Sequence, residues 1–490
     1  MITQKLRLSL FALLLTSTAS WAAATAEEAA KMQATFQTYL GNEAGIVAVA
    51  PAGDGYDITI DPMVYFNKVK EPGFSASFKP LVYHAVSSGD GLWKVAAQQA
   101  LDIKFGNPAS LTVDLKMPDY KLSGTFSEER LGFLDVTTSS GPLTLAENII
   151  DTNAGVSTSV SLTAQNTNMV FKAVPTSDGS ADTSMDITYD GMSMSTTSVS
   201  GGGQPISLAY TIPKMAYTSK ASGMNNRKLL DLLAWFVARP TKEQIVRDQA
   251  ELKTKLKAVL PVAKNITGSA TMDKLSVTTP VGVVAFDSFG FGANLNGIVK
   301  DGHFGESINF TGLQIPQGIA PPWSAGLIPT TLKFGFDVSG FDAEAPVTMF
   351  IDQMDVSKAE PIPPGSEQLY MGAFAPKNTI QLTIPAGEIS SGTYSLSYEG
   401  TSTISFTGLP QVNAKFRMTG MDKVIAQLQQ AATDPTAQQG MAMLFAAKGI
   451  GKADGDAITW DVTMSPEGKL LVNGTDLSSM MGAIAPPPQQ

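Results

Sequence analysis

The sequence predicts a mainly β protein of the α+β class, built on an extended, curved antiparallel sheet of many hairpins that could form a groove. Apolar and polar residues alternate with a period of two along most of the chain, as in strands that are buried on one face. Turn-forming Gly, Pro, Asn and Asp interrupt this alternation every roughly 8 to 15 residues, which is typical of hairpins. Helical periodicity is limited to a few blocks, chiefly near 226–260 and 421–448.

The N-terminus has the features of a secretory signal peptide. Lys5 and Arg7 give it a positive start, Leu8–Leu15 is a short apolar run, and Ser20–Ala26 offers small-residue cleavage sites. The apolar run is much shorter than the roughly 20 residues that a membrane-spanning helix needs. We therefore expect residues 1–24 to be removed during export. The mature protein is expected in the periplasm, with no transmembrane segment.

The composition excludes several classes of function. Asp and Glu number 44 against 34 Lys and Arg, so the formal net charge is −10. Binding to nucleic acid is not expected, because it requires a concentrated basic face. The chain has no Cys, which excludes disulfides, thiol catalysis and Cys-ligated zinc or iron–sulfur sites. Packing and sheet hydrogen bonds must therefore hold the fold together.

The strands are predicted by segments in which apolar and polar side chains fall on opposite faces. The clearest are 56–60, 111–117, 185–189 and 332–338, with a closing hairpin at 457–462 and 469–472. Turn chemistry is predicted at 53–55, 177–179, 190–191, 301–302, 467–468 and 473–474. These segments indicate half-buried antiparallel strands joined by tight turns.

Three helical regions interrupt the strands. The first is expected near 27–40, where Thr25 and Glu28 can form a capping box. The second runs from about 226 to 260 and breaks at Pro240, after which Thr241 and Gln244 can cap its second half. The third runs from 421 to 448, interrupted by Pro435 and ended by Gly449.

This order of segments predicts the organisation of the chain. The expected parts are a signal peptide (1–24), an N-terminal β-rich half (25–225), a helical block (226–262), a second β-rich half (263–418), a C-terminal helix and hairpin (419–480) and a disordered tail (481–490).

Several late segments carry a family resemblance. Phe406–Pro410, the amphipathic helix after it and the final element Gly468–Gly474 (GKLLVNG) resemble the exported alphaproteobacterial proteins grouped as domain of unknown function 2125. More distantly, Lys274–Leu313, with short strands around Gly-rich turns, is similar to the envelope proteins related to AsmA, whose folded sheets resemble a groove for lipid. The resemblance implies a β-groove or curved sheet in the periplasm and supplies no catalytic residues.

No catalytic or metal-binding set is evident, so the chain is not expected to be an enzyme or to need a cofactor. The two histidines, His84 and His303, are interpreted as surface residues, and neither neighbours a nucleophile elbow. Ser-x-x-Lys and H-E-x-x-H are both missing. Asp178, Asp182 and Asp186, with Asp190, recur at a spacing of four and are interpreted as a solvated acidic face rather than an ion site.

Two apolar segments are candidate binding surfaces. The helical run 229–237, with Leu233 and Phe236, must be buried in the fold, against a partner or against lipid. The loop 315–323, with Ile315, Pro316, Ile319 and Trp323, could line a groove, cover it or cross between sheet layers.

These observations favour a non-catalytic periplasmic binding or scaffold protein that holds a lipid or another apolar ligand in a sheet groove. One alternative is an envelope assembly factor acting through protein partners. Another is a carboxylate-dependent envelope hydrolase. A lipid binder requires an apolar lining more than one side chain wide, whereas an assembly factor requires an open strand edge.

Overall fold

The computed structural model describes residues 24–201, 203–358, 360 and 365–477. The expected signal peptide, apart from its last residue, and the expected C-terminal tail lie outside these residues. The described part is mainly β, with antiparallel strands joined largely as hairpins, so the predicted fold class is confirmed. It divides into two compact units: unit 1 contains the described residues of 24–272, 277–280 and 347–360, and unit 2 contains those of 273–276, 281–346 and 365–477.

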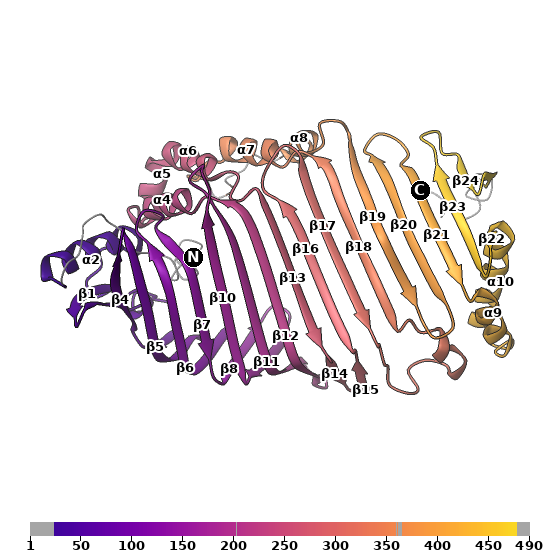
Figure 1. Cartoon of the computed structure of the whole chain (residues 1–490), viewed down its shortest axis with the longest axis horizontal. Coiled ribbons are helices and arrows are strands. Elements are labelled where there is room, and N and C mark those ends of the chain that lie inside the picture. The colour runs from indigo at the N-terminus through magenta and orange to yellow at the C-terminus, as the bar shows by residue number, and fades with distance from the viewer. Residues whose placement is uncertain (1–23, 202, 359, 361–364, 478–490) are drawn as a thin grey trace. The chain divides into compact units, whose positions relative to one another are not determined.

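Unit 1 contains most of the long strands (Figure 1). Its strands are β1 (Val47–Ala52), β2 (Gly55–Ile60), β3 (Ser75–Phe78), β4 (Leu81–Gly89), β5 (Leu92–Asn107), β6 (Leu111–Ser127), β7 (Gly132–Ser140), β8 (Leu143–Asp151), β9 (Val156–Ala164), β10 (Asn166–Pro175), β11 (Ala181–Ser200), β12 (Ile206–Met224), β13 (Asn265–Asp273) and β14 (Ser276–Thr279). Its helices are α2 (Ala26–Leu40), α3 (Met63–Phe66), α4 (Asn226–Val237), α5 (Lys242–Arg247) and α6 (Gln249–Val259), and most of α7 (Glu344–Gln353) also belongs to it.

The strands of unit 1 form an antiparallel meander. β1, β2, β4, β5 and β6 pair in that order, and β3 pairs with β5. β7 pairs with one half of β6, and β8 pairs with the other half. β10 then pairs with β7, and β9 pairs with β8. β11 then pairs with both β10 and β9, and β12 pairs with β11 along nearly its whole length.

An aligned set of irregularities crosses these strands, and we call it the crease. In β6, β7–β8, β9–β10, β11 and β12, two successive side chains on one face lie three residues apart instead of two. The pairs are Met117 and Tyr120, Ser140 and Leu143, Ala164 and Thr167, Tyr189 and Met192, and Ile212 and Met215. The extra residues include Pro118, Pro142, Gly191 and Pro213, residue types that interior strands tolerate at bulges.

The crease corrects one expectation. Asp190 and Gly191 do not form a turn between strands but lie inside β11, where Gly191 has a φ of 57°. Glycine adopts this left-handed conformation without the steric cost that a Cβ brings. The predicted turns at 177–179, 467–468 and 473–474 are confirmed, because Gly179, Gly468 and Gly474 have positive φ between paired strands.

The core of unit 1 lies under its first helix. Met32, Phe36 and Leu40 of α2 pack with Trp93 of β5 and Phe126 of β6, and all five are buried. Only half of the capping box predicted at Thr25 and Glu28 is present: the Thr25 side chain accepts a hydrogen bond from the Glu28 N–H, but the Thr25 N–H donates to the Tyr56 hydroxyl at 2.9 Å. Helices α4, α5 and α6 gather at one end of the strands (Figure 1). The capping box of Thr241 and Gln244 is confirmed, at the start of α5.

Unit 2 is a second antiparallel meander. Its strands are β15 (Gly282–Ala285), β16 (Ser288–Asn296), β17 (Gly302–Thr311), β18 (Thr331–Phe341), β19 (Thr379–Ser390), β20 (Ser395–Ser405), β21 (Gln411–Thr419), β22 (Lys452–Asp454), β23 (Ala457–Met464), β24 (Leu470–Val472) and β25 (Thr475–Asp476), and its helices are the 3-10 helix η1 (Pro322–Leu327), α8 (Glu367–Phe374), α9 (Met421–Gln429) and α10 (Pro435–Ile450). Strands β16 to β21 pair in chain order, β23 follows β21, and β24 follows β23.

The helices after β18 differ in detail from the prediction. α7 and α8 lie in a segment where only strands were expected, because their short apolar runs resemble strands when periodicity alone is considered. α10 starts at Pro435, as the predicted break requires, but continues through Gly449 to Ile450. Buried residues of α9, including Val424 and Leu428, form the core of this unit with Trp460 of β23.

Candidate functional site

One face of the unit 1 sheet is apolar across all its long strands, and we call it the apolar face of unit 1. Directly opposed residues in antiparallel strands share a face, so the register identifies its members. They include Ile103, Phe105, Leu115, Leu122, Leu145, Leu162, Met169, Ile187, Met194, Tyr210 and Tyr217. The opposite face carries Lys, Asp, Ser and Thr side chains. Along β5 to β12, the charged side chains that the register places on the apolar face are Glu147 and Asp151, both in β8.

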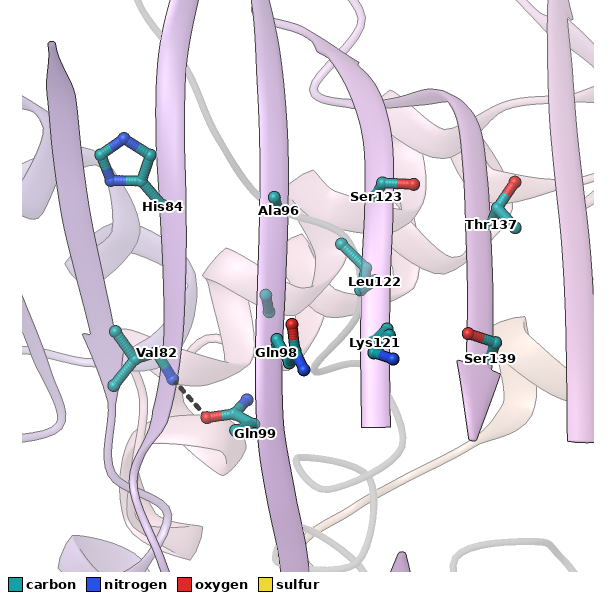
Figure 2. Close-up of a pocket in the computed structure, with 11 residues that line it drawn as sticks. Val82, His84, Ala96, Gln98, Gln99, Lys121, Leu122, Ser123, Thr137 and Ser139 are labelled. Atoms are coloured by element: carbon teal, nitrogen blue, oxygen red, sulfur yellow. Dashed lines mark hydrogen bonds between the residues drawn. The ribbon is translucent and has the colours of Figure 1, made fainter. Parts of the chain in front are cut away.

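A row of polar side chains crosses this apolar face beside the crease, and we call it the polar row. Its members are Gln99, Tyr120, Ser140, Thr167 and Tyr189, each directly opposite the next on the neighbouring strand. The Gln99 Oε1 accepts a hydrogen bond from the Val82 N–H at 3.1 Å (Figure 2). The Gln99 Nε2 and the Thr167 Oγ1 are buried without a hydrogen-bond partner among the described atoms.

Two tyrosines of this region, Tyr120 and Tyr83, are held in their neutral form. Burial raises the pKa of Tyr120 above its ordinary value. Burial, and then the neighbouring Tyr120, also raise the pKa of Tyr83, which lies on β4 opposite Ile58 of β2 and on the same face. A low-dielectric environment disfavours the charged phenolate. The polar row and Tyr83 therefore present uncharged hydrogen-bonding groups within an apolar surface.

Unit 2 also has an apolar face, and a row of large side chains crosses it from β16 to β23. Phe291, Phe334, Tyr398, Phe416 and Trp460 form this aromatic row, with Ile308 between the first two. The Phe334 and Tyr398 ring centroids lie 6.4 Å apart. The row crosses six strand spacings and therefore extends roughly 29 Å.

Gly387 of β19 allows the two halves of the aromatic row to meet. It lies opposite Tyr398, where a side chain would fill the gap between Phe334 and that ring. A Cβ on this residue would lie 2.5 Å from the Tyr398 Cε2 and 2.7 Å from the Lys333 carbonyl oxygen. The Tyr398 hydroxyl donates a hydrogen bond to the same carbonyl at 3.0 Å. The glycine thus lets an aromatic ring lie over the strand backbone.

Several side chains on the apolar face of unit 2 are unusually exposed. The exposed fractions are 45% for Phe291, 41% for Leu295, 39% for Phe334 and 36% for Phe416. Since a large apolar side chain has roughly 150–250 Å² to bury, these four together leave about 300 Å² of apolar surface in water. The largest apolar patch on a typical monomeric protein is about 300–600 Å² and is often functional, so this face is a candidate binding surface.

The helical segment predicted as a candidate surface lies in the fold. Leu233 of α4 is 9% exposed and packs with Leu230, Tyr39 and Leu131. Phe236 is half-buried and contacts Trp235 edge to face, with ring centroids 5.1 Å apart. The sequence left three surroundings open for this segment: the fold, a partner or lipid. These contacts agree with burial in the fold.

The predicted apolar loop connects β17 to β18. These strands are paired neighbours, so the expectation that the loop crosses between sheet layers is wrong. Trp323, in η1, packs against the core around α9, and its Nε1 donates a hydrogen bond to the Asp434 Oδ2 at 3.1 Å. Ile319 is 50% exposed, whereas Ile315 and Pro316 are half-buried. The structure therefore places these residues between β17 and β18 in unit 2, whereas Leu233 and Phe236 belong to unit 1.

The polar face of unit 1 has a shallow open depression (Figure 2). His84, Ala96, Ser123 and Thr137 lie across it on neighbouring strands. The His84 Nδ1 is 2.8 Å from the Asp57 Oδ1, and this hydrogen bond is the main reason that the pKa of His84 is raised. No described Ser, Thr or Lys side chain is hydrogen-bonded to this histidine, so the depression has no nucleophile activated by it.

The aspartates at a spacing of four are used in the structure of the sheet. Asp178 pairs with Lys264 at 2.8 Å, Asp182 accepts a hydrogen bond from the Gly223 N–H, and Asp186 accepts one from Thr218. The described residues contain no cluster of three or more His, Asp or Glu side chains placed to hold a metal ion. None of the described helices combines the length and the apolar character needed to cross a membrane.

Sequence reasoning missed both rows. Each row joins residues that are far apart in the chain and becomes visible only with the strand register. The one available signal was local: Pro and Gly within otherwise regular strand patterns, at Pro118, Pro142, Gly191 and Pro213, mark bulges. Comparison of the chain with known protein families, curated proteins and solved structures finds no match.

Proposed function

We propose that this chain is a non-catalytic binding protein of the periplasm that holds the acyl chains of a lipid on the apolar faces of its two units. The observation that carries the proposal is the aromatic row, where Phe291, Phe334 and Phe416 remain more than a third exposed. Covering apolar surface yields about 25 cal/mol per Å², so the roughly 300 Å² exposed here favours an apolar ligand by several kcal/mol. The resemblance to AsmA-related proteins supports the same class of ligand.

The alternative of an assembly factor that offers a strand edge has less support. β1 pairs only with β2 among the described strands, which makes its other side the natural edge. However, the Gln33 side chain of α2 accepts a hydrogen bond from the Val49 N–H at 3.1 Å, and α2 packs over the same strand. Covering an edge in this way prevents strand addition. A hydrolase has less support still, since no nucleophile is activated beside His84.

The proposal is tested by native mass spectrometry and lipid extraction on the secreted form of the chain, purified without detergent. We expect a phospholipid or fatty acid at defined stoichiometry. Phe334→Asp and Phe416→Asp should each lower its occupancy at least fivefold, because each places a charge against the acyl chain.

Val199→Asp is the matched control. Val199 is also 39% exposed, but the register places it on the polar face of unit 1. Its substitution should leave lipid occupancy unchanged. A ligand-free protein, or equal losses in all three variants, would overturn the proposal.

A further inference from the structure

One carboxylate lies on the apolar face of unit 2. Along the described strands from β16 to β23, Glu306 of β17 is the charged residue that the register places among the apolar side chains of this face. It is exposed, and no described Lys, Arg or His side chain forms an ion pair with it. Covering a charge without a partner is costly. A ligand that lies on this face must therefore either avoid Glu306 or supply a group that pairs with it.

Aromatic rings surround Glu306. Phe336 of β18 lies directly opposite it, Phe304 lies two residues before it on the same face of β17, and Phe291 of β16 is a diagonal neighbour. The Cβ atoms of such neighbours are about 5–8 Å apart, so these side chains can contact one ligand group together. Ala293 lies opposite Glu306 on its other side, and this small, exposed residue leaves the carboxylate accessible.

A carboxylate among aromatic rings favours an organic cation. The faces of aromatic rings attract ammonium groups, and the carboxylate adds a charge of opposite sign. A calcium ion is not favoured, because it needs about six to eight oxygen ligands and the neighbours of Glu306 are apolar. In unit 1 the charged residues of the apolar face, Glu147 and Asp151, are acidic too. Neither face therefore offers a cation to an anionic head group.

The aromatic row provides a place for an apolar chain next to Glu306. From Phe334, another diagonal neighbour of Glu306, the row continues to Tyr398 and Phe416. This stretch runs from β18 to β21, which is three strand spacings or roughly 14 Å. One leaflet of a bilayer provides about 15 Å for an acyl chain. Beyond Phe416 the row ends at Trp460, which is buried in the core formed with α9.

We propose that Glu306 and the phenylalanines around it form the head-group site for an amphiphile with a cationic ammonium end. In this arrangement the ammonium group pairs with the Glu306 carboxylate and contacts the rings of Phe291 and Phe336, while the acyl chain lies along the aromatic row from Phe334 to Phe416. The inference rests on the proposed function and adds to it the charge of the ligand's head group. It also gives the carboxylate on this apolar face a function.

The test compares three probes with the same twelve-carbon chain on the full secreted chain at about pH 7.5: dodecyltrimethylammonium, dodecanol and dodecanoate. Binding is measured by equilibrium dialysis below the micelle concentration. Salt at about 150 mM screens the attraction of a cation to the acidic protein as a whole. We expect the ammonium probe to bind about fivefold more tightly than dodecanol, and dodecanoate to bind more weakly than either.

Single variants locate the effect. Glu306→Gln removes the charge and keeps the shape, so it should abolish the preference for the ammonium probe over dodecanol. Glu399→Gln is the matched control, because Glu399 is also an exposed residue of unit 2 but lies opposite Lys415, on the polar face. It should keep the preference. Phe336→Leu should lower the affinity for the ammonium probe about threefold, as expected for an exposed cation–π contact, and change the affinity for dodecanol little.

The outcomes separate this inference from the proposed function. Equal affinity of the wild-type chain for the ammonium probe and dodecanol, tighter binding of dodecanoate, or equal losses in Glu306→Gln and Glu399→Gln would overturn the cationic head-group site while leaving an apolar-ligand protein. Binding of none of the three probes would overturn both. The wild-type comparison requires no variant, so the inference remains testable even if a substitution disturbs folding.

Discussion

The two units have the same kind of sheet face and interrupt it with opposite chemistry. In unit 1 the row across the strands is polar and mostly half-buried, and it runs beside a crease of aligned bulges. In unit 2 it is aromatic, with Phe291, Phe334 and Phe416 more than a third exposed and Trp460 buried, and the strands it crosses have separate irregularities in β19, at Pro385 and Ala386, and in β18, at Gly340. A bulge in a single strand locally disturbs its pairing with the neighbouring strands. When the bulges of neighbouring strands are aligned, the strands stay paired, and the side chains beside the bulges form a line across the sheet.

Under the proposed function, this difference gives a meander of similar strands two types of apolar surface. An apolar face alone favours any hydrophobic chain and does not distinguish among head groups. A surface selects a ligand by its head group only if the protein has polar atoms that lack a hydrogen-bond partner without that ligand. A ligand without the complementary group leaves these atoms unsatisfied, which costs binding free energy. Unit 1 has this feature in Gln99 and Thr167, and unit 2 has the larger exposed apolar area together with the exposed carboxylate of Glu306.

The largest expected effect comes from removing the extra residue of β6. Deletion of Asp119 leaves Met117 and Tyr120 two residues apart, so β6 becomes regular and keeps its faces, but Leu111–Met117 must shift along β8 because Ser140 and Leu143 on the other side stay three residues apart. The shift breaks ladder hydrogen bonds, and we expect the free energy of unfolding, measured in urea, to fall by about 3 kcal/mol or more.

Deletion of Gly318 serves as the control for this change. Gly318 lies in the exposed loop between β17 and β18, with nothing within 4 Å of its Cβ position. The loss of one residue there should cost less than about 1 kcal/mol, since surface loops tolerate changes in length. Equal stability of the two deletion variants would show that the pairing of β6 with β7 and β8 does not depend on its extra residue.

An intermediate effect is expected in the aromatic row of unit 2. Gly387→Ala places a Cβ against the Tyr398 ring and the Lys333 carbonyl, so the ring must move or the strand must shift. We expect a loss of about 1–3 kcal/mol in the free energy of unfolding, which is typical of overpacking. Gly392→Ala, with nothing within 4 Å of its Cβ position, should change stability little. If both variants unfold at the same urea concentration, the close contact at Gly387 is absent.

The sequence alone was sufficient for the elements whose signals are local. Alternation predicted the strands, Thr25 and Thr241 predicted helix starts, and Pro435 predicted a helix break. The prediction of a turn at Asp190–Gly191 was wrong, because a turn and a bulge can both require a left-handed glycine. They differ in whether the chain then reverses direction or continues along the same strand. The two rows could not be predicted from the sequence, because no residue in them is unusual until its cross-strand neighbour is known.

The smallest expected effect concerns the polar face of unit 1. The hydrogen bond to Asp57, and a weaker one to Asp54, raise the pKa of His84 above its ordinary value of 6.5. The stability from this pair is therefore fully present below about pH 6.5 and is lost as the pH rises through the folded pKa. Because the His84 side chain is 38% exposed, solvent screening should keep the contribution below about 1 kcal/mol. Nuclear magnetic resonance titration should give His84 a pKa above 6.5, and His84→Asn should remove the corresponding part of the fall in stability between about pH 5.5 and 8.5. A titration midpoint at or below the ordinary value would contradict the pairing, and it would leave the polar face with no role in stability that depends on pH.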